Sequence, residues 1–171
     1  MNAATYSALE TLRDGRRVEI RALRPEDQAA FGEAVSQASR KSLYLRFFAM
    51  KSGVSEAEIA SFVHVDFVDH VALIAVISED GKPAIVGGAR YIVTKPAQAE
   101  VAFAVLDAYQ GQGIGSMLMR HLGAIARGAG ITELIAEVLS ENLPMLRVFE
   151  RSGLSPILKR GAGTVHVSLR L

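Results

Sequence analysis

Residues 110–116 read Gln-Gly-Gln-Gly-Ile-Gly-Ser and lie directly between an apolar run and an amphipathic segment. Before them, residues 101–106 are continuously apolar, which is typical of a buried strand. After Gly113, apolar residues recur at helical spacing, at Ile114, Met117, Leu118, Leu122 and Ile125. The pattern predicts a strand that enters a glycine-rich turn and then a helix. Such a turn can hold phosphate, because glycine lets the backbone approach an anion and the first helical N–H groups point at it.

Three known phosphate-binding patterns can be compared with this turn. A dinucleotide fingerprint, G-x-G-x-x-G from Gly111, finds Ser116 where the third glycine belongs. A Walker A loop needs Gly-Lys-Ser/Thr at its end, and the chain has no lysine between Lys95 and Lys159. The pattern that remains is Gln110-x-x-Gly113-x-Gly115. A glycine-rich turn of this kind can also serve packing alone.

This hexapeptide resembles the acyl-CoA pyrophosphate loop, Q/R-x-x-G-x-G/A, of the GNAT N-acetyltransferase superfamily. Upstream, residues 99–105 (Ala-Glu-Val-Ala-Phe-Ala-Val) resemble the strand that leads into this loop in protein-acetylating GNAT enzymes. Downstream, residues 141–154, which include Asn142 and end in Gly153-Leu154, resemble a later helix of the superfamily.

The N-terminal half adds a narrower resemblance. Residues 18–27, 39–48 and 69–73 look like the catalytic domain of bacterial Pat-type protein lysine acetyltransferases, and the resemblance extends from about Leu12 to the C-terminus. It implies the GNAT acyl-CoA N-acyltransferase fold, a mixed α/β architecture whose twisted, mostly antiparallel central sheet has helices on both faces. We also expect residues 1–171 to form a single acetyltransferase domain, with residues 1–10 a flexible or strand-like N-terminal segment.

Local signals place the elements. Asp14 and Gly15 mark a hairpin turn, Pro25 opens a helix, and Ser55 and Glu58 form a capping box. The expected strands are 9–12, 17–23, 71–77, 84–93, 98–106, 133–139 and 164–169. The expected helices are 25–38, a short piece through 48, 55–64, 113–128 and 142–152.

Bulk properties exclude several classes of protein. No apolar run reaches the ~18 residues that span a membrane, and the first nine residues lack a signal-peptide pattern. We therefore expect a cytoplasmic protein that does not bind membranes. The chain has no cysteine for a disulfide or thiolate metal site, and a net charge of +1 gives no reason to expect a nucleic-acid partner. A monomer and a homodimer are both compatible with the sequence.

Acetyl transfer needs a neutral amine, although a lysine with a pKa of about 10.4 is almost wholly charged at neutral pH. Glu100 is the candidate general base, since burial at the start of an apolar strand would raise its pKa toward the working range. From the residues alone, a strand start at the solvent edge is an equal interpretation of Glu100; the resemblance implies the catalytic glutamate. It also implies that a backbone N–H near Ala104 or Val105 stabilises the thioester oxygen, with Ala104 the named donor.

The resemblance implies that acetyl-CoA is the co-substrate, with the pantetheine arm lying along the strand like an added strand. Asn142 is expected to cap a helix and to contact that arm. Many GNAT enzymes have tyrosine where this chain has Phe149, so no general acid is assigned there. The residues expected to bind the cofactor are Phe103, Ala104, Val105, Gln110, Gly111, Gln112, Gly113, Ile114, Gly115, Ser116, Asn142, Met145 and Phe149.

A metal site is not expected. His64, Asp66, Asp69 and His70 are potential ligands, but their apolar neighbours indicate a packed element that ends in a polar turn. A contact of His70 with the acceptor substrate is the better interpretation. The aromatic residues Tyr44, Phe47 and Phe48 favour a core position, although the resembled family places this segment beside the acceptor channel.

The sequence thus predicts an acetyl-CoA-dependent N-acetyltransferase acting by direct attack of an amine, with a protein lysine, for example of an acyl-CoA synthetase, as the acceptor. Two alternatives remain open. One is a small-molecule amine N-acetyltransferase, and the other is a non-catalytic acyl-CoA-binding regulatory module.

Overall fold

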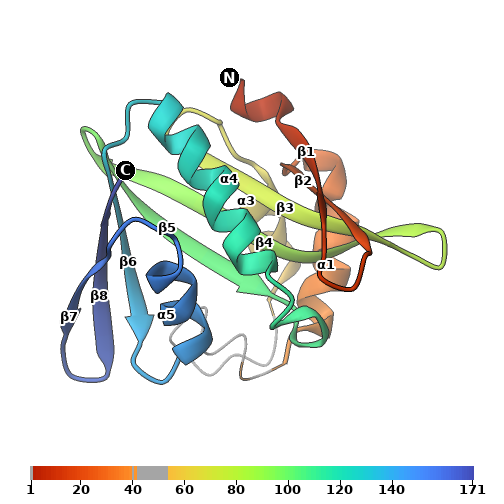
Figure 1. Ribbon diagram of the computed structural model, residues 1–171. Coiled ribbons are helices and arrows are strands. Elements are labelled where there is room, and N and C mark those ends of the chain that lie inside the picture. Colours follow the sequence, from red (N-terminus) through yellow and green to blue (C-terminus); the bar gives the residue numbers. More distant parts are fainter. Residues whose placement is uncertain (1, 40, 42–53) are drawn as a thin grey trace.

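The computed structural model describes residues 2–39, 41 and 54–171. An eight-stranded sheet forms its centre, in the order β1-β2-β3-β4-β5-β6-β8-β7 (Figure 1). Every neighbouring pair is antiparallel except β5 and β6, which confirms the mixed α/β, mostly antiparallel prediction. The strands are β1 (Ser7–Thr11), β2 (Arg17–Ala22), β3 (His70–Glu79), β4 (Lys82–Lys95), β5 (Gln98–Val105), β6 (Glu133–Leu139), β7 (Ile157–Arg160) and β8 (Thr164–Arg170).

Helices cover both faces of this sheet (Figure 1). Helices α4 (Ile114–Gly128) and α5 (Leu143–Glu150) lie on one face, and α1 (Gln28–Gln37) and α3 (Glu56–Val63) lie on the other. Short 3-10 turns are η1 (Ala3–Thr5), η2 (Pro25–Asp27) and η3 (Asp107–Tyr109). In the described ranges, no helix is long and apolar enough to cross a membrane.

The strand patterns explain the two hydrophobic cores. Alternate residues of β5, such as Val101 and Phe103, are buried against the α4 face, whereas Glu100 and Ala104 point to the other face and are exposed. On the α1 and α3 face, Leu23, Val63 and Ile74 belong to a smaller core, against which part of α1 packs. The sheet therefore has a separate hydrophobic core on each face.

Most expected elements are found within two residues of their predicted ends. Residues 7–11 form a strand, and Ser55 and Glu58 form the expected capping box at the start of α3. The four-residue strand β7 is missing from the prediction, because its burial is too slight to produce a clear alternating pattern. The expected helical piece through residue 48, with Tyr44, Phe47 and Phe48, lies outside the described residues apart from Ser39 and Lys41.

Strands β5 and β6 pair only at their starts. The register pairs are Gln98 with Glu133, Ala99 with Leu134 and Glu100 with Ile135. Beyond Glu100 the two strands separate, while β6 continues to pair with β8 as far as Leu139 and Thr164. The sheet therefore has an internal opening between β5 and β6 beyond these three pairs.

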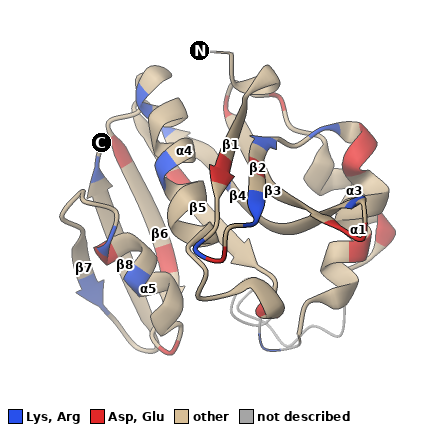
Figure 2. Ribbon diagram, turned by 45° about the vertical axis from the view of Figure 1, so that its right-hand side comes forward, with Lys and Arg blue, Asp and Glu red and all other residues tan. Residues whose placement is uncertain are grey.

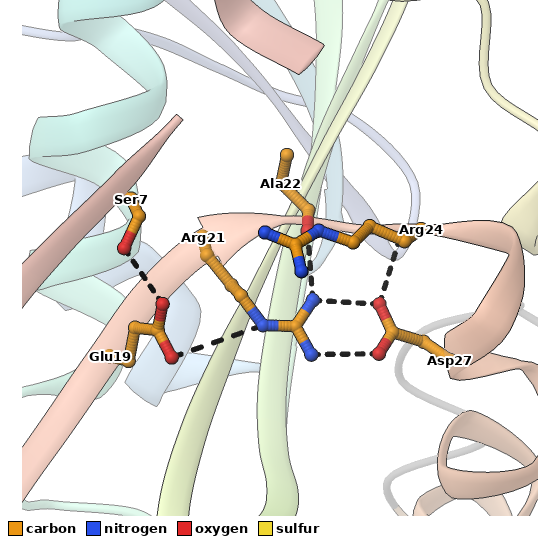
Figure 3. Close-up of polar contacts among 6 residues, drawn as sticks. All are labelled: Ser7, Glu19, Arg21, Ala22, Arg24 and Asp27. Atoms are coloured by element: carbon orange, nitrogen blue, oxygen red, sulfur yellow. Dashed lines mark hydrogen bonds and ion pairs between the residues drawn. The ribbon is translucent and has the colours of Figure 1, made fainter. Parts of the chain in front are cut away.

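A largely buried ion pair joins the end of β2 to the start of α1 (Figure 3). The Arg21 guanidinium donates from Nη2 and Nη1 to the two Asp27 oxygens, at 2.7 and 2.8 Å. The Arg24 N–H also donates to Asp27 Oδ2, at 2.8 Å. Both side chains are almost buried, 13% and 12% exposed. This bidentate contact fixes where α1 begins over the sheet.

Candidate active site

A groove of about 370 Å³ lies on the α4 and α5 side of the opening between β5 and β6. Its walls are the end of β5, the glycine-rich loop after η3, and the first turns of α4 and α5. The expected cofactor-binding residues on these walls are Phe103, Ala104, Val105, Gln110, Gly111, Gly113, Ile114, Gly115, Ser116, Asn142 and Met145. The structure thus brings together residues that are separated by about forty positions in the sequence.

The start of α4 supplies an anion-binding surface to this groove. Gly113 is the N-cap of the helix with φ +93°, and no side chain caps the helix there. The first intrahelical bond of this turn runs from the Met117 N–H to the Gly113 carbonyl, at 3.0 Å. The N–H groups of Ile114, Gly115 and Ser116 precede it and have no partner within the helix. With the partial positive charge of a fifteen-residue helix, they form a site for phosphate.

Gly115 serves helix packing as well. A Cβ built on Gly115 would lie 3.1 Å from Val148 Cγ2 in α5, which is closer than almost all real Cβ contacts. No atom lies within 4 Å of a Cβ built on Gly113 or Gly111, both of which have positive φ. The glycines of this loop therefore have different roles. Gly113 allows the backbone conformation that starts the helix, and Gly115 allows the close approach of α5.

Gln110 fixes the end of β5. Its Nε2 donates to the Val105 carbonyl at 3.0 Å, on the loop side of the strand. The neighbouring Leu106 N–H donates to Val86 in β4, at 2.9 Å. Since N–H groups alternate between the two edges of a strand, the Val105 N–H points to the groove and the Ala104 N–H points to β4. This alternation favours Val105 over Ala104 as the backbone donor.

Glu100 lies where the pairing of β5 and β6 ends. It shares a sheet face with Ala102 and Ala104 and is in register with Ile92 of β4. The sequence predicted that the Glu100 carboxylate is partly desolvated. This prediction was wrong, because Glu100 is exposed in the structure. The residue starts the strand on an open face, because α1 and α3 cover the sheet over β2 to β4 and not over this end of β5. The carboxylate is accessible to a substrate from that face.

Asn142 has the expected capping role. Its Oδ1 accepts a hydrogen bond from the Met145 N–H, at 3.3 Å, and it also lines the groove. Two other expected cofactor residues do not line it. Phe149 is 1% exposed and packs edge-on against Phe103, with centroids 5.8 Å apart, because the apolar face of α5 turns into the core. Gln112 turns away and accepts a hydrogen bond from Arg16 at 2.9 Å.

Basic residues on the groove are the part of the site that the sequence did not reveal. They are Arg13, Lys41, Arg147 and Arg151. Figure 2 shows basic residues on α5 and in the β1–β2 turn. Arg147 and Arg151 are four positions apart, so they share one face of the helix that follows Asn142. This spacing could have indicated from the sequence that both are close to the groove. Arg13 comes from a hairpin about a hundred residues away, and no local pattern indicates it.

The His and Asp residues near position 66 have structural partners. Asp66 accepts hydrogen bonds from the N–H groups of Val68, Asp69 and His70, which lower the pKa of its carboxyl. The His64 ring contacts the Ala60 carbonyl at 2.6 Å. Burial and the nearby Arg90 lower the pKa of His70. Within residues 2–39, 41 and 54–171, no three His, Asp or Glu residues are grouped as metal ligands.

Comparison with known proteins gives the family. Residues 35–154 match the Acetyltransferase (GNAT) family. The chain belongs to this family. Acetyltransferase PA5475 of Pseudomonas aeruginosa is 33% identical to this chain over 80% of this chain and 74% of its own length. Acetyltransferase Pat of Mycolicibacterium smegmatis is 31% identical over 83% of this chain, which spans 42% of that protein.

A solved structure agrees with these relatives. The GNAT domain of S. lividans PAT superposes with a TM-score of 0.86 at 36% identity, covering 96% of this chain and 97% of that chain. The protein is therefore an acetyl-CoA-dependent GNAT N-acetyltransferase related to Pat enzymes.

Proposed function

We propose that this enzyme transfers the acetyl group of acetyl-CoA to the ε-amine of a lysine on a folded protein. The observation that carries the proposal is the position of Glu100. Its carboxylate lies at the point where β5 and β6 separate, on an open sheet face, while the phosphate-binding start of α4 lies on the opposite face. An acceptor and a CoA thioester can thus approach β5 from opposite sides.

Each step of the transfer has a candidate group. Phosphates are held by the first N–H groups of α4 and by the side chains of Arg147 and Arg151. Because β5 is unpaired with β6 beyond Glu100, its edge can hydrogen-bond the pantetheine amides as a neighbouring strand would. These contacts bring the thioester carbonyl to the Val105 N–H, which is already oriented by Gln110.

Glu100 then removes the proton from the attacking ammonium. The neutral amine attacks the thioester carbon, the carbon–nitrogen bond forms, the carbon–sulfur bond breaks, and the second proton on the nitrogen goes to water or to the departed sulfur. CoA leaves as a thiolate, whose pKa of about 8.5 makes departure without a general acid feasible. This matches the buried Phe149, which offers no proton at the groove.

The choice of a protein acceptor is supported by the relationship to Pat enzymes along almost the whole chain. It is also supported by the open surface around Glu100, where Ile92 is 47% exposed beside the carboxylate. Exposed apolar area next to a catalytic group suits a folded partner, which buries surface on docking. An acyl-CoA synthetase with a reactive lysine is the class of substrate that we propose, and acetylation would remove that lysine's charge.

The test is a comparison of kcat/KM across acceptors at a fixed acetyl-CoA concentration. A folded acyl-CoA synthetase is compared with free lysine, polyamines and aminoglycosides, and mass spectrometry locates the acetylated residue. We expect one lysine of the synthetase to react at least about tenfold faster than any small amine, a difference of about 1.4 kcal/mol. A small amine that is the better substrate by that factor would contradict the protein-lysine proposal.

A further inference from the structure

A second cavity, of about 130 Å³, lies on the other face of the sheet, beneath α1 and beside α3. Its roof comes from Phe31, Ala34 and Val35 of α1 and from Ala38, which follows the helix, and its floor comes from β3, β4 and β5. Among the described residues that line it, Arg90 alone carries a charge. The cavity is therefore an apolar binding space that the phosphate loop and the acetyl transfer described above do not use.

This cavity meets the cofactor groove at the end of β5. Phe103, Ala104 and Val105 line both spaces, so only this part of the strand separates them. The Val105 N–H, which points to the groove, marks where the thioester carbonyl is held. Whatever is attached to that carbonyl therefore starts within reach of the apolar cavity.

Small residues line the route by which an acyl chain can pass from the groove, around the end of β5, into the cavity. Ala102 and Ala104 of β5 share one sheet face, and Gly88 of β4 is in register with Ala104. A Cβ built on Gly88 would meet no atom closer than 3.4 Å, so its absence leaves free space above β4. A larger side chain at any of these positions would close the route, and the chain has none there.

We propose that this cavity takes the acyl chain of acyl-CoAs longer than acetyl-CoA, so that the enzyme transfers acyl groups of about four to six carbons. The upper chain length follows from the cavity volume, because a protein cavity of about 150 Å³ holds benzene, a molecule of about six carbons. The inference rests on the proposed function only in placing the thioester at β5. The chemistry is unchanged. The acyl carbon–sulfur bond breaks and CoA leaves as the thiolate, the carbon–nitrogen bond forms, and of the two protons that the acceptor ammonium loses, one goes to Glu100 and the other to water or to the thiolate.

The charge of the cavity favours an acyl chain over the acceptor lysine. The Arg90 guanidinium lies 4.6 Å from the centroid of the Phe62 ring and 3.3 Å from His70 Nε2. A lysine ammonium entering here would meet this like charge and an apolar wall, and both raise its free energy. A neutral hydrocarbon chain meets neither cost and gains from leaving water.

The experiment measures the affinity of the whole protein for acetyl-, butyryl-, hexanoyl- and decanoyl-CoA by calorimetry without an acceptor. We expect the affinity to rise by up to roughly fourfold per buried methylene from acetyl to hexanoyl, and to stop rising at decanoyl, which exceeds the cavity. Ala34→Leu fills the roof and should remove this rise while leaving acetyl-CoA affinity unchanged. Ala29→Leu, on the exposed side of the same helix, is the matched control and should keep the rise.

The inference is overturned if the folded protein binds acetyl-CoA but its affinity is flat or falls from acetyl to hexanoyl. It is also overturned if a folded Ala34→Leu protein keeps the wild-type dependence on chain length; Ala38→Leu replaces it should Ala34→Leu not fold. Binding of acetyl-CoA without transfer to any protein would instead contradict the proposed function. The two failures are therefore distinguishable.

Discussion

Glu100 and Ile135 form the last register pair between β5 and β6, and the two strands separate beyond them. Among the strands that the structure describes, the only parallel pairing is thus also the shortest, three residue pairs long. Its early end creates the edge that we propose binds pantetheine, and it leaves the Glu100 carboxylate exposed where that edge begins, on the sheet face away from the groove. The topology of the sheet and the chemistry of the site therefore have the same origin.

Replacement of Glu100 by glutamine tests its role as general base. Glu100→Gln should lower kcat by about a hundredfold or more, because the amine must then lose its proton to water. The affinity for acetyl-CoA should hardly change, since the side chain faces away from the groove. The rate of the variant should rise with pH, as more of the acceptor lysine becomes neutral.

Glu137→Gln is the matched control for this experiment. Glu137 is another exposed strand glutamate, paired with His166 on β8, and its substitution should leave kcat within about twofold of wild type. Wild-type turnover at neutral pH in the Glu100→Gln protein would remove Glu100 from the mechanism.

The conformation of Gly113 gives a test of the phosphate loop. Gly113→Ala forces a side chain into φ +93°, which costs roughly 1–2 kcal/mol and shifts the N–H groups that follow. We expect affinity for acetyl-CoA, measured by calorimetry, to fall at least about tenfold. Gly130→Ala places the same strain at φ +82° after α4, outside the groove, and should lower thermal stability alone. Equal affinities in the two variants would mean that the loop does not bind the cofactor.

The basic residues of α5 should contribute to phosphate binding. A double variant, Arg147→Gln with Arg151→Gln, should weaken acetyl-CoA binding by about tenfold or more, since a charged hydrogen bond contributes roughly 1.5–3 kcal/mol. The loss should be smaller at high salt, where the attraction is already screened. Arg127→Gln, at the end of α4, should change neither value. An affinity of the double variant equal to wild type at low salt would contradict this assignment.

The parts of the site that could be predicted are those with a local pattern. The phosphate loop follows from glycines between an apolar strand and a helical repeat, and Asn142 follows from its position before a helix. The glycines of this loop and Asn142 all lie on the groove wall. A turn, a cap and a strand depend on neighbours along the chain, so their residue types are sufficient to indicate them.

What the sequence did not show depends on contacts between distant segments. Arg13 reaches the groove from the β1–β2 hairpin, and the exposure of Glu100 depends on where α1 and α3 end over the sheet. Phe149 was expected at the cofactor, but the rotation of α5 turns it toward Phe103. The apolar cavity had no local signal in the sequence, since its lining residues come from five elements, α1, α3, β3, β4 and β5.

The Arg21–Asp27 pair predicts how stability depends on pH. Burial by itself would raise the pKa of Asp27, but the hydrogen bonds from Arg21 and from the Arg24 N–H outweigh it, so the pKa is lowered. The folded protein then holds this proton less tightly than the unfolded chain does. The contribution to stability is therefore complete well above the unfolded value of about 3.9, and it is lost as the pH falls through the lower folded-state value.

Asp27→Asn should thus lower the free energy of unfolding at pH 7 by about 1–3 kcal/mol, because the Arg21 charge stays almost buried and loses its anion. The variant should also lose part of the decline in stability that the wild type shows in acid. Denaturant titrations at pH 7 and near pH 4 measure both effects. Asp14→Asn is the control, since Asp14 pairs with Arg16 at the surface and should change stability far less. If the two variants are equally stable at pH 7, the Arg21–Asp27 pair does not anchor α1 over the apolar cavity.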